Sequence, residues 1–315
     1  MEEIRTVNIN DKNYPKLLKE IKDAPKVLYY RGEILPRTEP KALVRGKSEE
    51  NCFAIVGTRR CSDYGKQVAL EIAGDLAEAG LIIVSGLAPG IDTFCHQAAV
   101  ERKKRTIAVL GTGLDEKSIY PQSNLNLAEK IIETGGCLIS EYPPGTRGTN
   151  FTFPQRNRII SGLSLGVLVI EAKPPLPNFG VGVSKKSGSG ALITAEWARK
   201  QKRLVFAVPG PIHSSNSKGP HYLIKQGAKL VENANDILKE LNLKLQRPDL
   251  CKTIIGETEE ENLILEALKE GALDIDKIIE KTKLPAQKVA STIAILEIKG
   301  KVRNLGANIY AISHR

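Results

Sequence analysis

The sequence contains little that would support a secreted, membrane-spanning or metal-binding protein. Its 315 residues include no run of about 18 apolar residues, and the amino terminus, MEEIRTVNINDK, is polar. The five cysteines are widely and irregularly spaced without a C-x-x-C pair, and no two of the four histidines have metal-ligand spacing. We therefore expect a cytoplasmic protein without a membrane segment, a disulfide framework or a metal site.

The motifs of common cofactor-binding and hydrolytic enzymes are also missing. No G-x-G-x-x-G opens a helix after a predicted strand, and no G-x-x-x-x-G-K-[ST] occurs, so neither a nicotinamide cofactor nor a P-loop is expected. GLSLG at 162–166 matches G-x-S-x-G by letter but precedes a strand, whereas a nucleophile elbow follows one. We interpret Ser164 as a loop or packing residue and His96 as a packed or helix-surface residue. No cofactor is predicted.

Positive charge is what the sequence has in excess, and it is concentrated in one segment. Lys and Arg number 46 against 36 Asp and Glu, a net charge of +10. From Tyr142 to Leu230, thirteen basic residues face only two acidic ones, Glu171 and Glu196. Such a concentration indicates a polyanionic partner, either nucleic acid or a phosphorylated ligand. For any single lysine, a solvated basic face is the alternative.

Residues 52–241 have the pattern of a doubly wound α/β domain with a mostly parallel sheet. Short apolar runs alternate there with amphipathic stretches that have helical spacing. The runs are FAIVG (53–57), LIIVS (81–85), TIAVLG (106–111), GCLIS (136–140), GVLVIEA (166–172), RLVFAVPG (203–210) and AKLV (228–231). Residues 1–51 are expected to form a smaller lead-in, with a helix in NYPKLLKEI and a strand in KVLYYRG.

The segments that follow these runs share a small, polar character. They are GTRRCSDYG, GLAPGID, GTGLDEKSIYP, EYPPGTRG and PGPIHSSNSKGP. Ligands bind beyond the carboxyl ends of strands in such sheets, and glycine-rich turns before helices suit anions. A single turn of this kind is ordinary, but five on one edge favour an anion site.

The block FTFPQRNRIISGLS at 151–164 combines guanidinium groups with aromatic rings. Arg156 and Arg158 flank Asn157, and Phe151 and Phe153 lie just ahead. These side chains suit a single strand of nucleic acid, and on a helix both arginines could approach one groove. The alternative is that the arginines pair with backbone or carboxylate groups and brace the fold.

The carboxyl-terminal part predicts a linker at 242–257 and a small winged-helix domain at 258–315. ENLILEALKEG, DIDKIIEKTK and PAQKVASTIAILEIKG have helical spacing, and KVRNLGANIYAI suggests a two-stranded ribbon. Residues 258–315 contain nine basic and nine acidic residues, and the third helix offers only Gln287, Lys288, Ser291 and Thr292 before it becomes apolar. This composition favours protein contact or dimer support over duplex reading.

Eight ordered blocks resemble the DprA/Smf family. They are AIVGTRRCSDYG, VSGLAPGIDTFCHQAAV, IAVLGTGLDEKSIYPQSN, ISEYPPGT, FPQRNRIISGLS, VIEAK, KSGSGALITAEWARKQKRLVFAVPG and LIKQGAKLV. The resemblance implies an extended Rossmann-like domain that binds single-stranded DNA without turnover and forms a homodimer. It further implies a protein that protects incoming DNA and loads a RecA-type recombinase in natural transformation.

The resemblance also implies the DNA-contacting residues. The Gly-Thr-Arg turn would place Arg59 in the DNA pocket, and the RNR block would place Arg156 and Arg158 there or beside it. The full expected set is Gly57, Thr58, Arg59, Arg60, Ser85, Gly86, Gly90, Phe153, Arg156, Asn157, Arg158, Lys173, Lys186, Ser187 and Gly188. Arginines and lysines in it would hold successive phosphates.

The sequence departs from the family pattern in three ways. We expect no sterile-alpha-motif-like domain ahead of the lead-in, KPPLPNFGVGVSK lengthens the loop before KSGSGALITAEWA, and the winged helix has few basic residues. The rival to a non-catalytic single-strand binder is a nucleotide-binding or nucleotide-cleaving Rossmann-like enzyme, although PPGTRGTN lacks the glutamate of the phosphoribohydrolase motif. A winged-helix regulator of duplex DNA is a third possibility, and the neutral tail counts against it.

Overall fold

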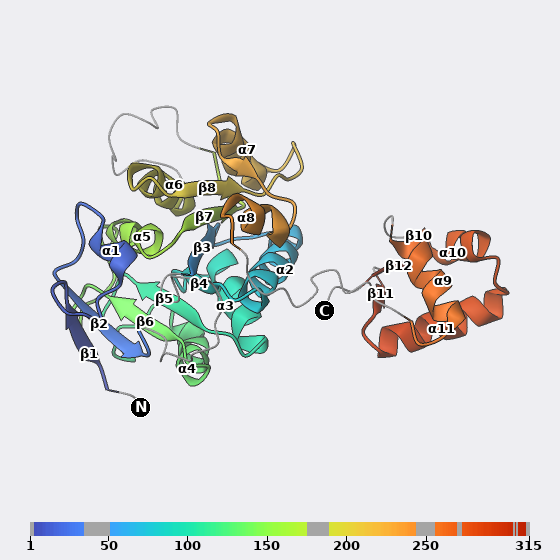
Figure 1. Cartoon of the computed structure of the whole chain (residues 1–315), viewed down its shortest axis with the longest axis horizontal. Helices are drawn as coiled ribbons and strands as arrows, with labels where there is room; N and C mark the ends of the chain where they lie inside the picture. Colours follow the sequence, from blue (N-terminus) through green and yellow to red (C-terminus); the bar gives the residue numbers. More distant parts are fainter. Residues whose placement is uncertain are drawn as a thin grey trace. The chain divides into compact units, whose positions relative to one another are not determined.

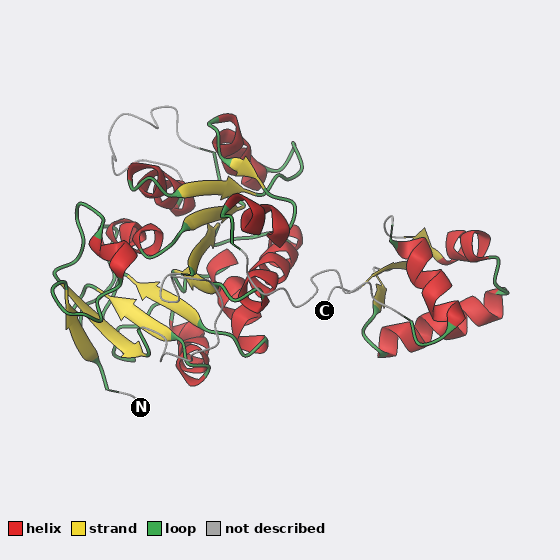
Figure 2. Cartoon of the chain, in the orientation of Figure 1, coloured by secondary structure: helices red, strands yellow, loops and turns green. Residues whose placement is uncertain are grey.

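The chain consists of two compact units, Met1–Pro248 and Asp249–Arg315 (Figures 1 and 2). The structure is a computed structural model that describes residues 3–34, 51–174, 189–243, 256–269, 273–304, 306 and 308–312. The larger unit contains a sheet with helices on both faces, and the smaller unit contains helices and a short sheet.

Within the described part of the larger unit, nine strands form one sheet in the order β1-β2-β6-β5-β4-β3-β7-β8-β9. The strands from β3 onward are parallel, whereas β1 and β2 are antiparallel. Their bounds are β1 Arg5–Asn8, β2 Val27–Gly32, β3 Cys52–Gly57, β4 Ile82–Ser85, β5 Thr106–Leu110, β6 Cys137–Ser140, β7 Gly166–Ile170, β8 Leu204–Ala207 and β9 Lys229–Leu230. The predicted doubly wound, mostly parallel fold is confirmed.

Side chains that alternate along the buried strands separate the two helical layers. In β5, Ile107 and Val109 join the core under α5 (Thr152–Gly162) and α6 (Gly190–Lys200). Ala108 and Leu110 face the opposite core, with α4 (Leu125–Glu133). Helices α2 (Asp63–Glu78) and α3 (Ile91–Glu101) pack on each other, and α3 packs on α4. Because both faces are covered, the strands carry the continuous apolar runs seen in the sequence.

The strand order reverses at β3, and this creates the crevice where ligands bind in such folds. From β3 the chain steps outward through β4, β5 and β6, then crosses back to β7 on the other side of β3 and continues through β8 and β9. The segments that leave β3 and β7 therefore diverge at their carboxyl ends. Helix α7 (Lys218–Lys225) follows β8, and α8 (Ala234–Glu240) packs against α2.

The lead-in belongs to this sheet and is not a smaller unit of its own. Strand β2 pairs antiparallel with β6, so that Tyr29 lies opposite Ser140, and β1, which was not predicted, pairs with β2. The predicted lead-in helix is a single turn, α1 (Lys16–Lys19), whose Leu18 is buried in the core under α5. The lead-in thus extends the sheet at its β6 end.

The smaller unit has the predicted winged-helix elements. Helices α9 (Glu259–Leu268), α10 (Ile275–Thr282) and α11 (Ala286–Ile298) enclose an apolar core that includes Leu265, Ile278 and Val289. Strands β11 (Val302–Asn304) and β12 (Ile309–Ile312) form the ribbon, and the short β10 (Leu273–Asp274) adds a third strand beside β12.

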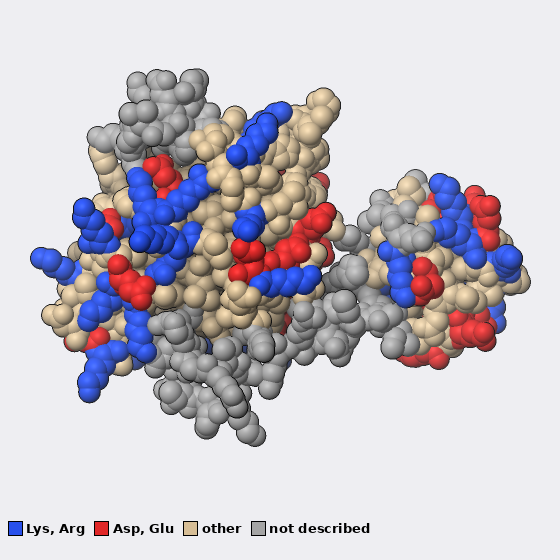
Figure 3. Space-filling model, turned by 45° about the horizontal axis from the view of Figure 1, so that its top comes forward, with Lys and Arg blue, Asp and Glu red and all other residues tan. Residues whose placement is uncertain are grey.

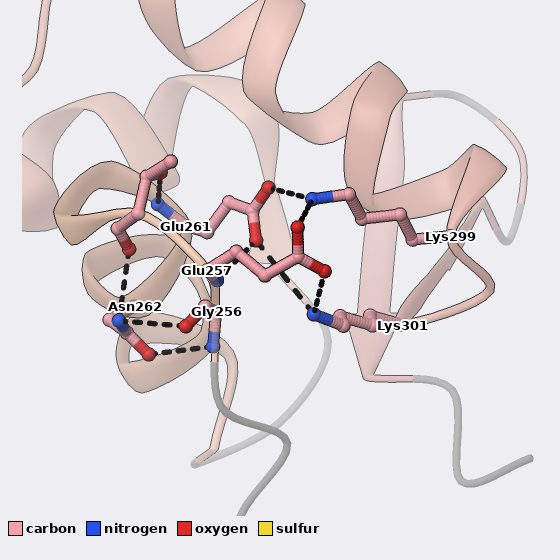
Figure 4. Close-up of polar contacts among 7 residues, drawn as sticks. Gly256, Glu257, Glu261, Asn262, Lys299 and Lys301 are labelled. Carbon is pink, nitrogen blue, oxygen red and sulfur yellow. Dashed lines mark hydrogen bonds and ion pairs between the residues drawn. The ribbon is translucent and has the colours of Figure 1, made fainter.

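Ion pairs close the smaller unit where α9 begins. Lys299 Nζ lies 2.8 Å from Glu257 Oε2 and 2.7 Å from Glu261 Oε1, and Lys301 lies 3.4 Å from Glu257 (Figure 4). These contacts tie the end of α11 to the start of α9. The carboxylates and ammonium groups of this cluster largely neutralise one another.

Candidate nucleic-acid interface

A cavity of about 860 Å³ opens at the carboxyl edge of the larger unit's sheet, where β3 and β7 diverge. Its walls come from the segments after β3, β4, β5, β6 and β7 and from the first turns of α5 and α6. The sequence pattern of five small, polar turns included four of these segments. The structure brings them to one site because the carboxyl ends of parallel strands share an edge.

The Gly-Thr-Arg turn after β3 is held rigidly and presents Arg59 to the cavity. A side chain at Gly57 would place Cβ 2.0 Å from the Ile170 carbonyl oxygen, so the close approach of β3 and β7 requires glycine. Gly90 has a φ of 82°, and a side chain at this position would clash with the Thr58 carbonyl oxygen. Arg59 follows this fixed backbone and is exposed.

Arg59 stacks on an aromatic pair at the cavity. Its guanidinium carbon lies 5.5 Å from the ring centroid of Phe153, and that ring lies 5.6 Å from the ring of Tyr120. Among the described residues, no carboxylate forms an ion pair with Arg59, so its charge is available to an anion. Phe153 and Tyr120 also line the cavity and offer ring faces.

Arg156 lines the cavity but is already bound within the protein. The side chain is 4% exposed, and Nη1 donates to the carbonyl oxygens of Gly86, at 2.8 Å, and Val109. Burial lowers its pKa to about 10, so it remains charged at neutral pH. A side chain on Gly86 would collide with the guanidinium. Arg156 therefore braces the turns after β4 and β5 and adds positive charge to the buried wall of the cavity.

Asp92 is a cavity carboxyl that the sequence analysis did not single out. It is 6% exposed, and it accepts a hydrogen bond from the Gly86 amide at 3.1 Å. Burial raises its pKa, and the nearby Arg156 opposes that shift. Its sequence signal was its place in GLAPGID, at the first turn of the helix that follows β4.

Arg158 lies away from the cavity, so the two arginines of the RNR block do not approach one groove. Arg158 forms a bidentate pair with Glu141, at 3.0 and 2.6 Å, and an ion pair with Asp23 at 3.3 Å. Residues two positions apart on a helix are separated by about 200° around its axis, which turns Arg156 and Arg158 to opposite sides of α5. The bracing role raised as an alternative from the sequence describes Arg158.

The structure places the full set of expected residues in three groups. The cavity lining includes Gly57, Thr58, Arg59, Phe153, Arg156, Asn157 and Lys173. Other expected residues lie behind or beside it, namely Arg60, Ser85, Gly86, Gly90 and Arg158. Ser85 is buried and donates to the Ile55 carbonyl at 2.6 Å. Lys186, Ser187 and Gly188 lie outside the described residues.

The first turn of α6 is a further part of the site that was not predicted. Ser189, Gly190 and Ala191 line the cavity, and Ser189, the N-cap, makes no side-chain capping bond. The amides of a first helical turn lack partners within the helix and favour anions. The Ser-Gly-Ser-Gly run before a helical pattern was the available signal.

The interpretations of His96 and Ser164 as packed residues are confirmed. Both are fully buried; His96 Nδ1 lies 2.8 Å from Thr106 Oγ1, and Ser164 donates to the Ile160 carbonyl at 2.8 Å. Across the described ranges, His, Cys, Asp and Glu form no group of three or more suited to a metal ion. A search of the same ranges finds no helix with the length and apolar character needed to cross a membrane.

The surface charge differs between the two units. On the face of the larger unit shown in Figure 3, Lys and Arg side chains gather over one region, and a group of acidic side chains occupies another. On the smaller unit the two signs lie side by side, in keeping with its ion pairs. A concentrated positive surface is the electrostatic footprint expected for a polyanion.

Comparisons with known proteins agree with this architecture. Residues 5–242 match the family model of DNA recombination-mediator protein A, and residues 252–308 match that of the DprA winged helix domain. The chain is 43% identical to DNA processing protein DprA of Bacillus subtilis over 238 residues, which cover 76% of this chain and 71% of that protein. It is 36% identical to Protein Smf of Escherichia coli over 294 residues, covering 91% and 72%.

Solved structures give the same relationship. DNA processing protein A of Streptococcus pneumoniae matches with a TM-score of 0.62 and 40% identity, covering 76% of this chain and 74% of that one. DNA processing protein A of Helicobacter pylori matches with a TM-score of 0.59 and 27% identity, covering 77% and 98%. The chain therefore belongs to the DprA/Smf family of DNA-processing recombination mediators.

Proposed function

We propose that this protein binds single-stranded DNA in the cavity at the carboxyl ends of β3 and β7. The observation that carries the proposal is the exposed Arg59, which stacks on Phe153 without a carboxylate partner among the described residues. A cation and a ring at one position suit a phosphate and an unpaired base. The structure of the Helicobacter pylori relative is described as one of its single-stranded DNA binding mode, which supports the proposal.

The cavity offers separate groups for the backbone and for the bases. Arg59, Lys173 and the first turn of α6 would hold phosphates, because the two side chains are positively charged and the start of a helix favours anions. Phe153 and Tyr120 would stack on bases without regard to sequence. Arg156, in the buried wall of the cavity, would hold the turns after β4 and β5 in place and add positive charge.

We further propose that the protein acts as a non-catalytic homodimer that protects incoming single strands and loads a RecA-type recombinase onto them. The match to the family model of DNA recombination-mediator protein A supports a role in recombination. The described cysteines, Cys52, Cys61, Cys95 and Cys137, are free, which fits action in a reducing cytoplasm.

One observation favours a second candidate, a nucleotide-binding or nucleotide-cleaving enzyme. Asp92 is a buried cavity carboxyl with a raised pKa beside a charged arginine, and such groups often act as acids or bases. Its hydrogen bond from the Gly86 amide equally fits a bracing role. Incubation with nucleoside monophosphates separates the two, because an enzyme would release free base and a DNA-binding mediator would not.

The main test compares oligo(dT), a duplex of equal length and nucleoside monophosphates at one salt concentration. We expect the single strand to bind most tightly, because the unneutralised cations line a cavity with ring faces that a duplex cannot use. If about three to five phosphates are contacted, log K should fall with log salt at a slope of roughly −2 to −3.5. Equal or tighter binding of the duplex would overturn the proposal.

A further inference from the structure

A loop beside the cavity forms a second exposed surface. The loop at 209–217 connects β8 to α7 and is fixed at three points. Tyr64 Oη donates to the Pro209 carbonyl at 2.7 Å, Asn216 Nδ2 donates to the Arg60 carbonyl at 3.2 Å, and the Ala172 amide donates to the Asn216 carbonyl at 2.7 Å. The loop is therefore a defined part of the fold.

These anchors place the loop at the cavity rim. Arg60 is the neighbour of Arg59 in the chain, and Ala172 is the neighbour of Lys173; Arg59 and Lys173 both line the cavity. Asn216 also donates a hydrogen bond to the carboxylate of Glu171 at 3.2 Å, and Glu171 directly precedes Ala172 in the chain. A strand that left the cavity between Arg59 and Lys173 would therefore pass the segments to which the loop is anchored.

The surface combines exposed apolar groups with unpaired cations. Ile212 is 67% exposed and Tyr64 is 42% exposed. Arg60 and Lys218 are exposed, and neither forms an ion pair among the described residues. Asp63 is an exposed acid on the same turn as Tyr64. We call Arg60, Tyr64, Ile212 and Lys218 the outer shelf.

We propose that a single strand bound in the cavity continues across the outer shelf, with Arg60 and Lys218 on phosphates and Tyr64 and Ile212 against bases. This inference rests on the proposed function. Single-strand binding proteins alternate cations with exposed ring or apolar faces along a groove of about 4 to 16 nucleotides. The outer shelf repeats the combination of a cation with a ring or apolar face that Arg59 and Phe153 make in the cavity. Exposed apolar groups without cations would instead be typical of a protein interface.

Oligonucleotide length separates the outer shelf from the cavity. Fluorescence anisotropy would measure the affinity of (dT)5, which the cavity alone should hold, and (dT)15, which reaches the shelf. Two double variants remove the shelf groups: Tyr64→Ala with Ile212→Ala, and Arg60→Ala with Lys218→Ala. Matched controls are Leu263→Ala, an exposed leucine of the winged helix, and Lys225→Ala, an exposed lysine at the end of α7. Tyr64→Phe keeps the ring but removes the hydrogen bond to the loop.

Each double variant should weaken (dT)15 binding about tenfold, the effect of losing one stacked base or two phosphate contacts, and (dT)5 binding less than twofold. The charge variant should also make the salt slope shallower by roughly 1.4 for (dT)15. The controls should bind both oligonucleotides normally, and Tyr64→Phe, which keeps the ring, should weaken (dT)15 binding less than the double variant Tyr64→Ala with Ile212→Ala.

Several results would overturn the inference. Equal weakening of both oligonucleotides would mean that the shelf residues only support the cavity. Unchanged DNA binding with an altered mass in sedimentation would mean that the surface is a protein interface. Failure of the unmodified protein to bind either oligonucleotide would instead overturn the proposed function itself.

Discussion

The basic side chains at the cavity of the larger unit and those of the winged helix differ in whether carboxylates neutralise them. In the winged helix, Lys277, Lys288, Lys299 and Lys301 all lie within 4 Å of a carboxylate. In the larger unit, the basic residues at the cavity have no such partner among the described residues, as Arg59 shows. The ability to attract a polyanion follows from the charge that remains after internal pairing, which is why we propose that the larger unit binds the DNA.

The third helix of the winged helix sharpens this contrast. A duplex reader would present polar and basic side chains there. On α11, however, Ile298 is 87% exposed and Ile295 is 46% exposed, and Lys288 pairs with Glu260 at 2.8 Å. The exposed face of α11 therefore mixes apolar side chains with Gln287, Ser291 and Glu297, and protein contact in place of duplex reading stays a prediction.

The largest expected effect concerns a neutralised arginine of the larger unit. Arg158→Ala should lower the free energy of unfolding by about 3–5 kcal/mol, because it leaves the nearly buried Glu141 without its partner. Urea unfolding of the larger unit measures this. The control is Lys200→Ala, which removes an exposed pair with Glu196 and should cost less than about 0.5 kcal/mol. A loss below about 1 kcal/mol for Arg158→Ala would show that the pair does not brace the fold.

Acid should act on the larger unit first. Burial lowers the pKa of His96 from 6.5 to about 3, so below pH 6.5 the unfolded state takes up a proton that the folded state refuses. Stability should therefore fall as the pH drops from 6.5 toward 3, by about 2 kcal/mol at pH 5. His96→Gln should flatten the dependence of the unfolding free energy on pH, even if the variant is less stable at neutral pH. An unchanged slope would contradict the assignment.

In the winged helix the acid response should come at lower pH. Hydrogen bonds from Lys299 lower the pKa of Glu257 and Glu261, and one from Lys288 lowers that of Glu260 to about 2. The stability from these pairs is present above the ordinary value of 4.5 and is lost as the pH falls toward 2. Added salt should weaken it. Thermal melting between pH 5 and 2 tests whether the smaller unit loses stability at lower pH than the larger unit.

Removal of one unneutralised arginine should weaken DNA binding without unfolding the protein. Arg59→Ala should lose about 1–2 kcal/mol of single-strand affinity, because both a phosphate contact and the stack on Phe153 disappear. Arg199→Ala, an exposed arginine of α6, serves as the control. Anisotropy and thermal melting are measured together. A variant that melts much lower yet binds normally per folded molecule would make Arg59 a structural residue.

Removal of the winged helix should have the smallest effect. A chain that ends after about residue 245 should bind single strands within a few-fold of the full chain, because the charges of the smaller unit neutralise one another. Its oligomeric state is measured alongside its affinity. If DNA binding collapses while the shortened chain stays folded and keeps its oligomeric state, the winged helix touches DNA despite its charge balance.

The sequence predicted most of the sheet because its central strands are buried on both faces. The run TIAVLG at 106–111 differs from β5 by one residue, for example. Strand β1 was missed because Val7 is its one buried residue, which leaves no apolar run on an edge strand. The segment that folds as the lead-in likewise gave no sign that β2 pairs with β6, since that pairing joins residues more than 100 positions apart.

The site was predictable where it depends on local sequence. The Gly-Thr-Arg turn needs glycine and places Arg59 directly after a strand, and both features can be read locally. The divergence of Arg156 and Arg158 on a helix could also be read locally, but the partners that hold each of them could not. Arg158 is claimed by Asp23, 135 positions away, whereas Arg156 is fixed by carbonyl oxygens of two other strand ends.

Ultraviolet cross-linking of the full chain to oligo(dT), followed by mass spectrometry of the peptides, tests most directly which unit holds DNA. We predict cross-links in the peptides that contain Tyr120 and Phe153, whose rings line the cavity, and none in α11. Competition with excess unlabelled oligo(dT) should remove them together. Cross-links confined to residues 286–304 would contradict the assignment of DNA binding to the larger unit.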